Sequence, residues 1–193
     1  MRLRAASTPP ESTPRCDQHD RAAPRRWPGQ AGPRRHNIRV TIERISDLAA
    51  GQVAALVAES EAQGSRFVRR LAEEWASGAN RFDRPGEALF VAHDEGRVVG
   101  VGGLNLDPYA AEPTVGRVRH LYVLTAYRRL GIGRRIVEEI IEAARGRFER
   151  LRLSTSNPEA ARLYERLGFH PRANVAHCTH AMELSAQPER TPT

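Results

Sequence analysis

From Ile38 onward, the hydrophobic residues of the chain switch repeatedly between strand-like and helix-like spacing. Ile38, Val40 and Ile42 are separated by polar residues, which is typical of a strand with one buried face. Ser46-Asp47 comes next and is expected to cap a helix over residues 48–57. The pattern therefore predicts a strand followed by a helix.

A second helix and a β-hairpin are predicted in the next stretch. Residues 66–77 carry apolar side chains at helical spacing, and we expect this helix to end at Gly78. Residues 88–92 and 98–106 are aliphatic runs, and Glu95-Gly96 between them favours a tight turn. Residues 107–116 contain two prolines, so we expect a loop before the next strand.

The second half of the chain shows the same mixture of spacings. In order, the pattern predicts a strand over 118–124, a helix over 132–144, a strand at Leu151 and Leu153, a helix from Pro158 to Gly168, and a last strand over 175–184. Asn157 stands just before the second of these helices, where it can cap the helix. Strands and helices mixed in this order predict an α+β fold or α/β sandwich around one sheet.

Residues 1–36 differ in composition from the rest of the chain. They contain eight arginines, three acidic residues and six prolines, with almost no aliphatic residues, so we expect a disordered extension. Its net charge of +5 makes up most of the formal +7 of the chain. The extension could be a nucleic-acid arm. We favour a solvated extension or a start codon placed too far upstream, and expect no nucleic-acid partner. The predicted domain then spans residues 37–184, with a polar tail over 185–193.

The composition excludes several kinds of chemistry. The chain has 193 residues, enough for one well-cored domain, and all 30 of its basic residues are arginine, so a lysine nucleophile or phosphate-loop lysine is excluded. Cys16 and Cys178 are too few for a disulfide framework or a cysteine-rich zinc site. We therefore expect a cytoplasmic protein without a metal. No apolar stretch approaches the roughly 18 residues of a membrane span, so no membrane partner is expected.

The most informative segment runs from His120 to Arg134, where a predicted strand leads through an arginine- and glycine-rich turn into a helix. Gly131 and Gly133 leave the backbone open to a ligand, and the first amides of a helix are unpaired and lie at the positive end of its dipole. Positive charge is added by Arg128, Arg129, Arg134 and Arg135. We therefore expect a phosphate or pyrophosphate site. The segment lacks the lysine of an ATP loop and the third glycine of a dinucleotide site.

This segment resembles the GNAT family of acyl-CoA-dependent N-acetyltransferases. Arg128-Arg-Leu-Gly-Ile-Gly133 is similar to the family's Arg/Gln-x-x-Gly-x-Gly/Ala loop, and Leu121-Tyr-Val123 is similar to the strand before it. Asn157-Pro-Glu-Ala-Ala-Arg-Leu-Tyr-Glu-Arg-Leu-Gly-Phe169 resembles a second family segment, in which a tyrosine precedes a Gly-Phe pair. The resemblance implies a mixed, mostly antiparallel central sheet of six to seven strands flanked by about four helices.

The resemblance also implies acetyl-CoA as co-substrate and a role for individual residues. The backbone of residues 121–123 would pair with the pantetheine arm, and the amides of residues 129–134 would hold the pyrophosphate. Asn157 would lie near the pantetheine or the substrate amine. Tyr164 would donate a proton to the leaving thiolate, the alternative being a tyrosine packed in the core. The implied cofactor-binding residues are Leu121, Tyr122, Val123, Arg128, Arg129, Leu130, Gly131, Ile132, Gly133, Arg134 and Asn157.

The general base is not identified by the sequence. Many relatives carry a glutamate at the position aligned with Arg117, so the usual base is missing. His120 could titrate near neutrality and act through water, but strand alternation is expected to turn it away from the face of Arg117 and Arg119. Arg117 could instead recognise a carboxylate on the acceptor. Asp83, Asp107 or solvent could then take the proton.

The expected function is acetyl transfer to a primary amine of a small molecule or a protein, with Tyr164 and His120 as candidate catalytic residues. The resemblance places the acceptor near residues 64–85 and 107–113. Four aromatic residues there could line its pocket or pack in the core: Phe67, Trp75, Phe82 and Tyr109. The alternative, suggested by the missing acid, is a catalytically weak acyl-CoA-binding regulatory module. A homodimer is left open.

Overall fold

The computed structural model describes residues 39–49 and 51–184, and the predicted extension 1–36 and tail 185–193 lie outside this part. In chain order its elements are β1 (Thr41–Ile45), α1 (Ala54–Ala62), α2 (Phe67–Ser77), β2 (Ala88–Asp94), β3 (Arg97–Leu106), β4 (Val115–Val123), a 3-10 turn (Thr125–Tyr127), α3 (Ile132–Ala144), β5 (Arg150–Leu153), α4 (Pro158–Arg166), β6 (His170–Pro171) and β7 (His180–Glu183). None of the described helices has the length and apolar character needed to cross a bilayer.

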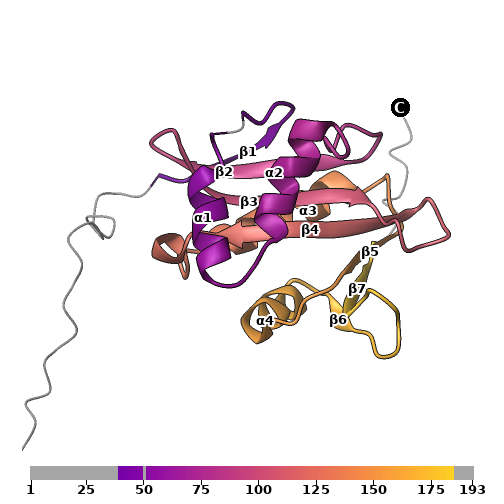
Figure 1. The fold of residues 1–193 in the computed structure, drawn as a ribbon. Helices are drawn as coiled ribbons and strands as arrows, with labels where there is room; N and C mark the ends of the chain where they lie inside the picture. The colour runs from indigo at the N-terminus through magenta and orange to yellow at the C-terminus, as the bar shows by residue number, and fades with distance from the viewer. Residues whose placement is uncertain (1–38, 50, 185–193) are drawn as a thin grey trace, which may run out of the picture. The chain divides into compact units, whose positions relative to one another are not determined.

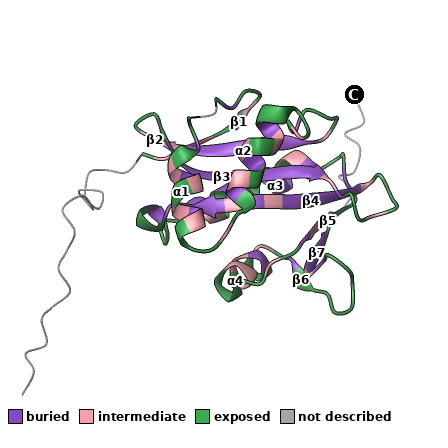
Figure 2. Cartoon of the chain, viewed as in Figure 1, coloured by how far each residue is buried: buried purple, intermediate pink, exposed green. Residues whose placement is uncertain are grey.

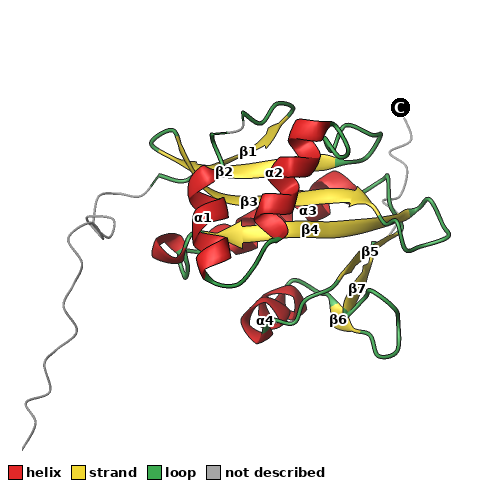
Figure 3. Cartoon of the chain, in the orientation of Figure 1, coloured by secondary structure: helices red, strands yellow, loops and turns green. Residues whose placement is uncertain are grey.

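The seven described strands form one sheet in the order β1-β2-β3-β4-β5-β7-β6. Neighbouring strands are antiparallel except β4 and β5, which run parallel. Helices α1 and α2 lie on one face of the sheet and α3 lies on the other, while α4 lies beside the end that holds β5, β6 and β7 (Figures 1 and 3). This architecture confirms the predicted fold class.

The hydrophobic core lies between the helices and the middle of the sheet. Helix α3 turns Ile136 and Ile140 inward at helical spacing, and both side chains are fully buried. Strand β3 is buried over nearly its whole length, because helices cover both faces of the sheet there. Figure 2 shows the same distribution, with buried central strands and with exposed residues on the outer sides of the helices and in the loops.

Local signals in the sequence placed several elements correctly. Helix α2 ends at Gly78, which is left-handed, and α3 has the predicted bounds of residues 132–144. Asn157 caps α4, because its side-chain oxygen accepts hydrogen bonds from two backbone amides of the first turn. The predicted hairpin turn is formed by Glu95 and Gly96, with φ of 48° and 79°. These four predictions are confirmed.

The first helix starts later than the sequence predicts. Helix α1 begins at Ala54, so the prediction that Ser46-Asp47 caps a helix over residues 48–57 is wrong. A turn takes up the intervening residues: the amide of Gln52 donates to the carbonyl of Ala49, and the Gln52 side chain accepts from the Ala49 amide. Apolar residues continue at helical spacing through this turn, so the pattern alone predicts a helix that starts too early.

The strands around the end of the chain also differ from the prediction. The sequence predicts a single strand over residues 175–184, but β7 covers only His180–Glu183, and the pattern does not predict the two-residue strand β6. Residues 172–179 form the connection between them, and arginines of β4 and β5 donate hydrogen bonds to two of its carbonyls. These hydrogen bonds from distant arginines take the place of strand pairing, so the local sequence pattern does not predict that the strand is interrupted here.

The parallel pairing of β4 with β5 is short. Only residues 115–117 of β4 pair with residues 150–152 of β5, although β4 continues beside β3 as far as Val123. From residue 118 onward, β4 therefore has a paired strand on the β3 side only. Its other edge carries backbone groups that strand pairing leaves unused, and this edge leads into the turn before α3.

Candidate active site

The turn between β4 and α3 presents a row of backbone amides. Arg129 and Gly131 adopt left-handed conformations, with φ of 66° and 78°, and Gly131 precedes α3 without any side-chain cap. Among the described residues, no backbone carbonyl accepts a hydrogen bond from the amides of residues 129–134. A Cβ atom added at Gly131 would meet no atom within 4 Å, so the space beside the turn is open. This geometry meets the requirements of an anion site.

Arg128 braces this turn against the strand that precedes it. Its Nε donates to the carbonyl oxygen of Val123 at 2.9 Å, and a terminal nitrogen donates to Oε1 of Gln63 at 3.0 Å. The guanidinium carbon lies 5.4 Å from the ring centroid of Tyr122, within the range of a cation–π contact. Arg128 therefore holds the end of β4, α1 and the turn together.

The other arginines of the turn lie at the surface. Arg129 pairs with Glu159 at 2.7 Å and so links the turn to the first turn of α4. Arg134 pairs with Glu138 at 2.8 Å, one turn further along α3. Arg135 donates to a backbone carbonyl ahead of β1. Positive charge surrounds the amides as predicted, but the acidic partners of Arg129 and Arg134 neutralise part of it.

A second anchor of the turn comes from Glu59 on α1. Its Oε1 accepts hydrogen bonds from the Tyr122 hydroxyl at 2.9 Å, the Thr125 amide at 2.8 Å and the Thr125 hydroxyl at 3.0 Å. Burial raises the pKa of Glu59, but these bonds and the charge of Arg128 outweigh it and lower the pKa below its usual value. Burial and the bond to Glu59 raise the pKa of Tyr122 to about 12.

The sequence pattern does not single out Glu59 or Gln63, which lies one helical turn further on. The Gln63 side chain donates to the Thr125 hydroxyl at 2.9 Å and accepts from Arg128. The one available signal is their spacing of four, which places both polar side chains on the same side of a helix. Their partners lie more than 60 residues further along the chain, so the sequence does not indicate what they bind.

Strand β4 contains a bulge at His120 and Leu121, which together oppose the single residue Gly102 of β3. His120 has a left-handed φ of 56°, a conformation that costs a non-glycine residue about 1–2 kcal/mol. The inserted residue reverses the alternation of side chains beyond it. Arg119, His120 and Tyr122 consequently all contact α1 or α2. The prediction that His120 faces away from Arg119 is therefore wrong.

His120 is buried and uncharged at neutral pH. Its Nδ1 donates to the backbone carbonyl of Phe67 at 2.9 Å, so Nε2 carries the lone pair, and Nε2 has no hydrogen-bond partner among the described residues. Burial, and next the charge of Arg119, lower the pKa of His120 to about 4. With this pKa, His120 is a weak proton acceptor, although its lone pair can accept a hydrogen bond.

Arg117 is held by contacts within the chain. Its guanidinium lies 3.5 Å from Oδ1 of Asp107, donates to the carbonyl of His177 at 2.9 Å, and stacks over the Tyr109 ring at 5.0 Å. The other Asp107 oxygen lies 3.4 Å from Nε of Arg152. These contacts occupy Arg117 and place Asp107 between two guanidinium groups, although its Oδ2 accepts no hydrogen bond among the described residues. They disfavour Arg117 as the binder of an acceptor carboxylate and Asp107 as the base.

Tyr164 lies on the inner side of α4. Its side chain is buried, and its ring packs edge-on against Phe169 with 5.5 Å between the centroids. Burial raises the pKa of the Tyr164 hydroxyl, so the hydroxyl keeps its proton at neutral pH. No described side chain holds that hydroxyl by a hydrogen bond. The ring thus packs as a core residue would, while the hydroxyl has the proton that a general acid needs.

Three predicted segments meet at the start of α3. A Cβ atom added at Gly133 would lie 3.6 Å from Cδ2 of Leu163 on α4 and 3.7 Å from Cγ2 of Val123 on β4. The unpaired amides, the free edge of β4 and the helix that carries Tyr164 are therefore neighbours. Asn157 lies at the start of the same helix, where its side-chain oxygen is used by the cap.

The expected acceptor region divides into exposed and core residues. Phe67 and Tyr109 are 36% and 54% exposed, whereas Trp75 and Phe82 are buried in the hydrophobic core. Phe67 lies at the start of α2, and its ring is 5.9 Å from that of Tyr122. Asp83 lies exposed in the loop before β2. Trp75 and Phe82 therefore pack in the core and do not line an acceptor pocket, while Phe67 and Tyr109 are accessible to a ligand.

Comparison with known proteins agrees with this geometry. Residues 53–169 match the sequence model of the acetyltransferase (GNAT) family. The uncharacterized N-acetyltransferase YjgM of Escherichia coli (strain K12) is 34% identical over 101 residues, which are 51% of this chain and 60% of YjgM. The match thus spans less than two thirds of that relative.

Solved structures share the fold. A protein from Exiguobacterium sp. 255-15, provisionally described as an acetyltransferase, is 31% identical with a TM-score of 0.67, and the match covers 76% of this chain and 94% of that one. A GCN5-related N-acetyltransferase from Kribbella flavida is 19% identical with a TM-score of 0.55, covering 74% and 95% of the two chains. At that lower identity, the likeness shows the fold alone.

Proposed function

Because this chain belongs to the GNAT acetyltransferase family, we propose that it transfers the acetyl group of acetyl-CoA to a primary amine by direct attack in a ternary complex. Acetyl-CoA is the co-substrate of the family and supplies an acetyl thioester. The amine nitrogen forms a bond to the acetyl carbon, the carbon–sulfur bond breaks, and the thiolate leaves. The chain's part is to bind both molecules, orient them and move protons.

The observation that carries the proposal is the row of open amides before and within the first turn of α3. Amides of residues 129–134 and the positive end of the helix dipole suit a pyrophosphate, and Gly131 leaves the approach clear. Arg129 and Arg134 stand at the surface beside these amides and can add ionic contacts. A nucleotide pyrophosphate is the ligand for which this arrangement is best suited.

The free edge of β4 suits the pantetheine arm. The Leu124 amide donates to Val99 of β3, so alternation turns the amide and carbonyl of Val123 away from β3. The carbonyl accepts from Arg128, which leaves the Val123 amide as a donor toward the edge that β5 does not cover. We assign this amide to the thioester oxygen, whose negative charge grows as the amine attacks.

Tyr164 is the general acid in this proposal. Its helix contacts the start of α3 through Leu163, and a tyrosine hydroxyl carries a proton at neutral pH that it can donate to the leaving thiolate. Neither of two candidate β4 side chains is suited to be the general base, because His120 has a pKa of about 4 and Arg117 is paired with Asp107. We therefore assign the proton released by the amine to water, so turnover should rise with pH until the amine itself is neutral.

The alternative is a catalytically weak module that binds acyl-CoA and regulates another protein. Arg117 at the usual acidic position favours it. The two proposals agree on acetyl-CoA binding and differ in turnover, since only an enzyme releases free thiol at a rate that depends on an added amine.

Calorimetric titration of acetyl-CoA and CoA into the full chain tests both proposals, followed by thiol release with a panel of primary amines. Binding at micromolar concentrations with amine-dependent thiol release supports the enzyme. Binding without turnover for any amine supports the regulatory module. Absence of binding to a demonstrably folded chain would overturn both, and the turn before α3 would then be structural only.

A further inference from the structure

Two arginines stand at the point where β4 and β5 separate. Arg117 and Arg152 form the last residue pair of the parallel β4–β5 pairing, and beyond them the edge of β4 is free. Arg117 lies two residues before Arg119, which contacts Glu74 of α2, so strand alternation places both β4 arginines on the α2 side of the sheet. His120 also contacts α2. The arginine pair therefore lies on the face where the acceptor is expected, next to the edge assigned to acetyl-CoA.

Both guanidinium groups converge on Asp107, the first residue of the β3–β4 loop. Nη1 of Arg117 lies 3.5 Å from Oδ1 of Asp107, and Nε of Arg152 lies 3.4 Å from Oδ2. The Asp107 side chain is fully buried, and the side chains of Arg117 and Arg152 are only 10% and 12% exposed. Buried charges are tolerated when they are paired, so these three residues stabilise one another. Asp107 thereby fixes the start of the loop to both strands.

The same two arginines reach the connection between β6 and β7. A terminal nitrogen of Arg117 donates to the carbonyl of His177 at 2.9 Å, and a terminal nitrogen of Arg152 donates to the carbonyl of Ala176 at 3.2 Å. A guanidinium has five N–H donors in a fixed plane, so it can bind a carboxylate and a carbonyl at once. Each arginine therefore bridges the β3–β4 loop, through Asp107, and the β6–β7 connection.

A pair of stacked rings joins these two loops at the surface. The ring of Tyr109 in the β3–β4 loop stacks on that of His177 in the β6–β7 connection, with 4.1 Å between the centroids and 21° between the planes. The guanidinium carbon of Arg117 lies 5.0 Å from the Tyr109 centroid, within the range of a cation–π contact. Tyr109 and His177 are both exposed. The two loops therefore meet at an accessible aromatic surface that is supported by buried charges.

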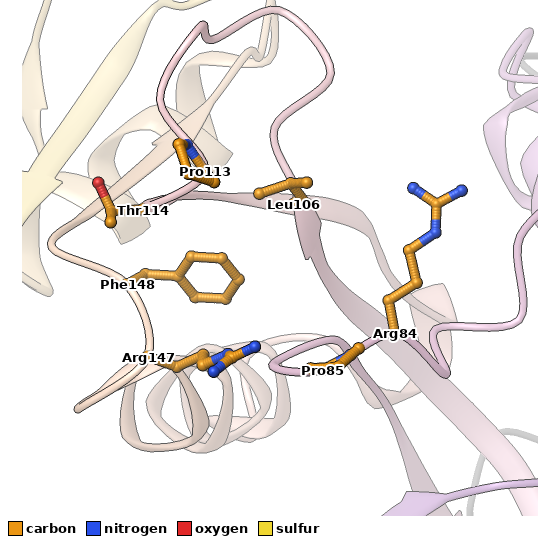
Figure 4. Close-up of a pocket in the computed structure, with 7 residues that line it drawn as sticks. All are labelled: Arg84, Pro85, Leu106, Pro113, Thr114, Arg147 and Phe148. Atoms are coloured by element: carbon orange, nitrogen blue, oxygen red, sulfur yellow. The ribbon is translucent and has the colours of Figure 1, made fainter.

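The β3–β4 loop is open on its other side. Figure 4 shows the loop rising between Leu106 and Pro113, and both residues line a hollow of about 450 Å³. Because side chains alternate along an extended chain, Leu106 turns toward the hollow and Asp107 turns toward the arginines. Apart from the backbone hydrogen bonds at its base, the loop is thus held by its contacts with the arginines and with His177.

We propose that Arg117 and Arg152 are positioning residues, which act through Asp107 to join the β3–β4 loop and the β6–β7 connection into one wall of the acceptor site. The acceptor would pack against the exposed stack of Tyr109 and His177, while the two arginines contact neither the amine nor the thioester. An arginine at the position where many relatives carry a glutamate then builds the acceptor site and is no sign of lost catalysis. This inference rests on the proposed acetyl transfer.

The test is steady-state thiol release with the primary amine that the unmodified chain uses best in the panel described above. Tyr109→Ala and His177→Ala each remove half of the exposed stack and leave the buried charges intact. Each should raise the KM for the amine about threefold to tenfold, because an aromatic contact is lost, and should change kcat by less than about twofold. The double variant should raise KM by clearly less than the product of the single effects, because each single change already breaks the same stack.

Arg152→Gln tests the buried part of the wall. It should raise the KM for the amine about tenfold, because the β6–β7 connection and Asp107 both lose a partner. Calorimetry should give an acetyl-CoA affinity within about twofold of the unmodified chain, which also shows that the variant is folded. The matched control is Arg150→Gln on the same strand, where the arginine pairs with Glu183 at the surface, and it should behave as the unmodified chain does.

An unchanged KM in both Tyr109→Ala and His177→Ala would overturn the proposal. A fall in kcat without a change in KM would also overturn it, since the stack would then act in the chemical step, and so would an equal rise of KM in Arg150→Gln. If Arg152→Gln failed to fold, the two surface variants would decide alone. Absence of thiol release by the unmodified chain with every amine is a different result: the proposed acetyl transfer would fail, and this inference with it.

Discussion

At the start of α3 the binding groups are backbone amides, whereas at the proposed transfer centre they are buried side chains. The amides of residues 129–134 are placed by two left-handed residues and by the start of a helix. Tyr164 packs against Phe169, five residues further along the chain, and His120 is held by a hydrogen bond to the backbone of Phe67, 53 residues earlier. The first region should tolerate many side-chain changes but not a change of backbone, and the second should respond to the loss of a single polar atom.

The largest effect is expected from Tyr164→Phe, which removes one oxygen from the buried side chain. If the hydroxyl protonates the thiolate, turnover should fall about 100-fold or more, the usual contribution of a general acid. Acetyl-CoA affinity should change by less than about twofold, because pyrophosphate binding uses backbone amides. Steady-state kinetics and calorimetry measure the two quantities.

Tyr127→Phe is the matched control for this experiment. Tyr127 is also buried, but its hydroxyl donates to Asp94 at 2.8 Å and has no role in the proposed transfer. Turnover near that of the unmodified chain is expected from it. If Tyr164→Phe behaved in the same way, Tyr164 would be a packing residue only.

His120 is expected to make stability depend on pH. Its pKa is about 4 in the folded chain and near 6.5 when unfolded, so below pH 6.5 the unfolded state binds a proton that the folded state excludes. The free energy of unfolding should therefore fall as pH drops from about 6.5 to about 4.5, by about 2–3 kcal/mol from this residue.

Urea unfolding at several pH values compares the unmodified chain with His120→Gln, in which this fall should be absent. His170→Gln, at an exposed histidine, should keep the pH dependence of the unmodified chain. If His120→Gln kept it too, His120 would be accessible to protons in the folded state. It could then act as a base near neutral pH.

The two regions also differ in how far the sequence predicts them. Gly131 and Asn157 act on their own neighbours in the chain, so the turn, α3 and the cap of α4 follow from local patterns. The orientation of His120 depends on one inserted residue in β4, and a bulge leaves no signal in the alternation that it interrupts. Glu59 and Gln63 depend on partners brought close by folding, so neither could be found from its own segment.

Gly131→Val tests the backbone region directly. Valine at a φ of 78° is strained, and its side chain would stand in the open space beside the amides. Acetyl-CoA affinity should fall about tenfold or more, measured by calorimetry. Gly96→Val is a close control, since Gly96 has a φ of 79°, also has no atom near an added Cβ, and lies in the β2–β3 turn. It should lose stability but keep its affinity, and an equal loss of affinity in both variants would assign the effect to strain.

The smallest effect is expected from Gln63→Ala, which removes a support of the turn without touching the amides. The substitution deletes the bonds to the Thr125 hydroxyl and to Arg128, each worth about 1 kcal/mol at most in this exposed position. Since Glu59 and Val123 still hold Thr125 and Arg128, acetyl-CoA affinity should fall only about two- to threefold. Turnover at saturating acetyl-CoA should not change. Gln52→Ala, which loses its bond with Ala49 in the turn before α1, is the control. A fall in turnover would mean that α1 positions the reacting groups in addition to supporting the turn. The distinction between a binding region built from backbone amides and a transfer centre built from side chains would then not hold.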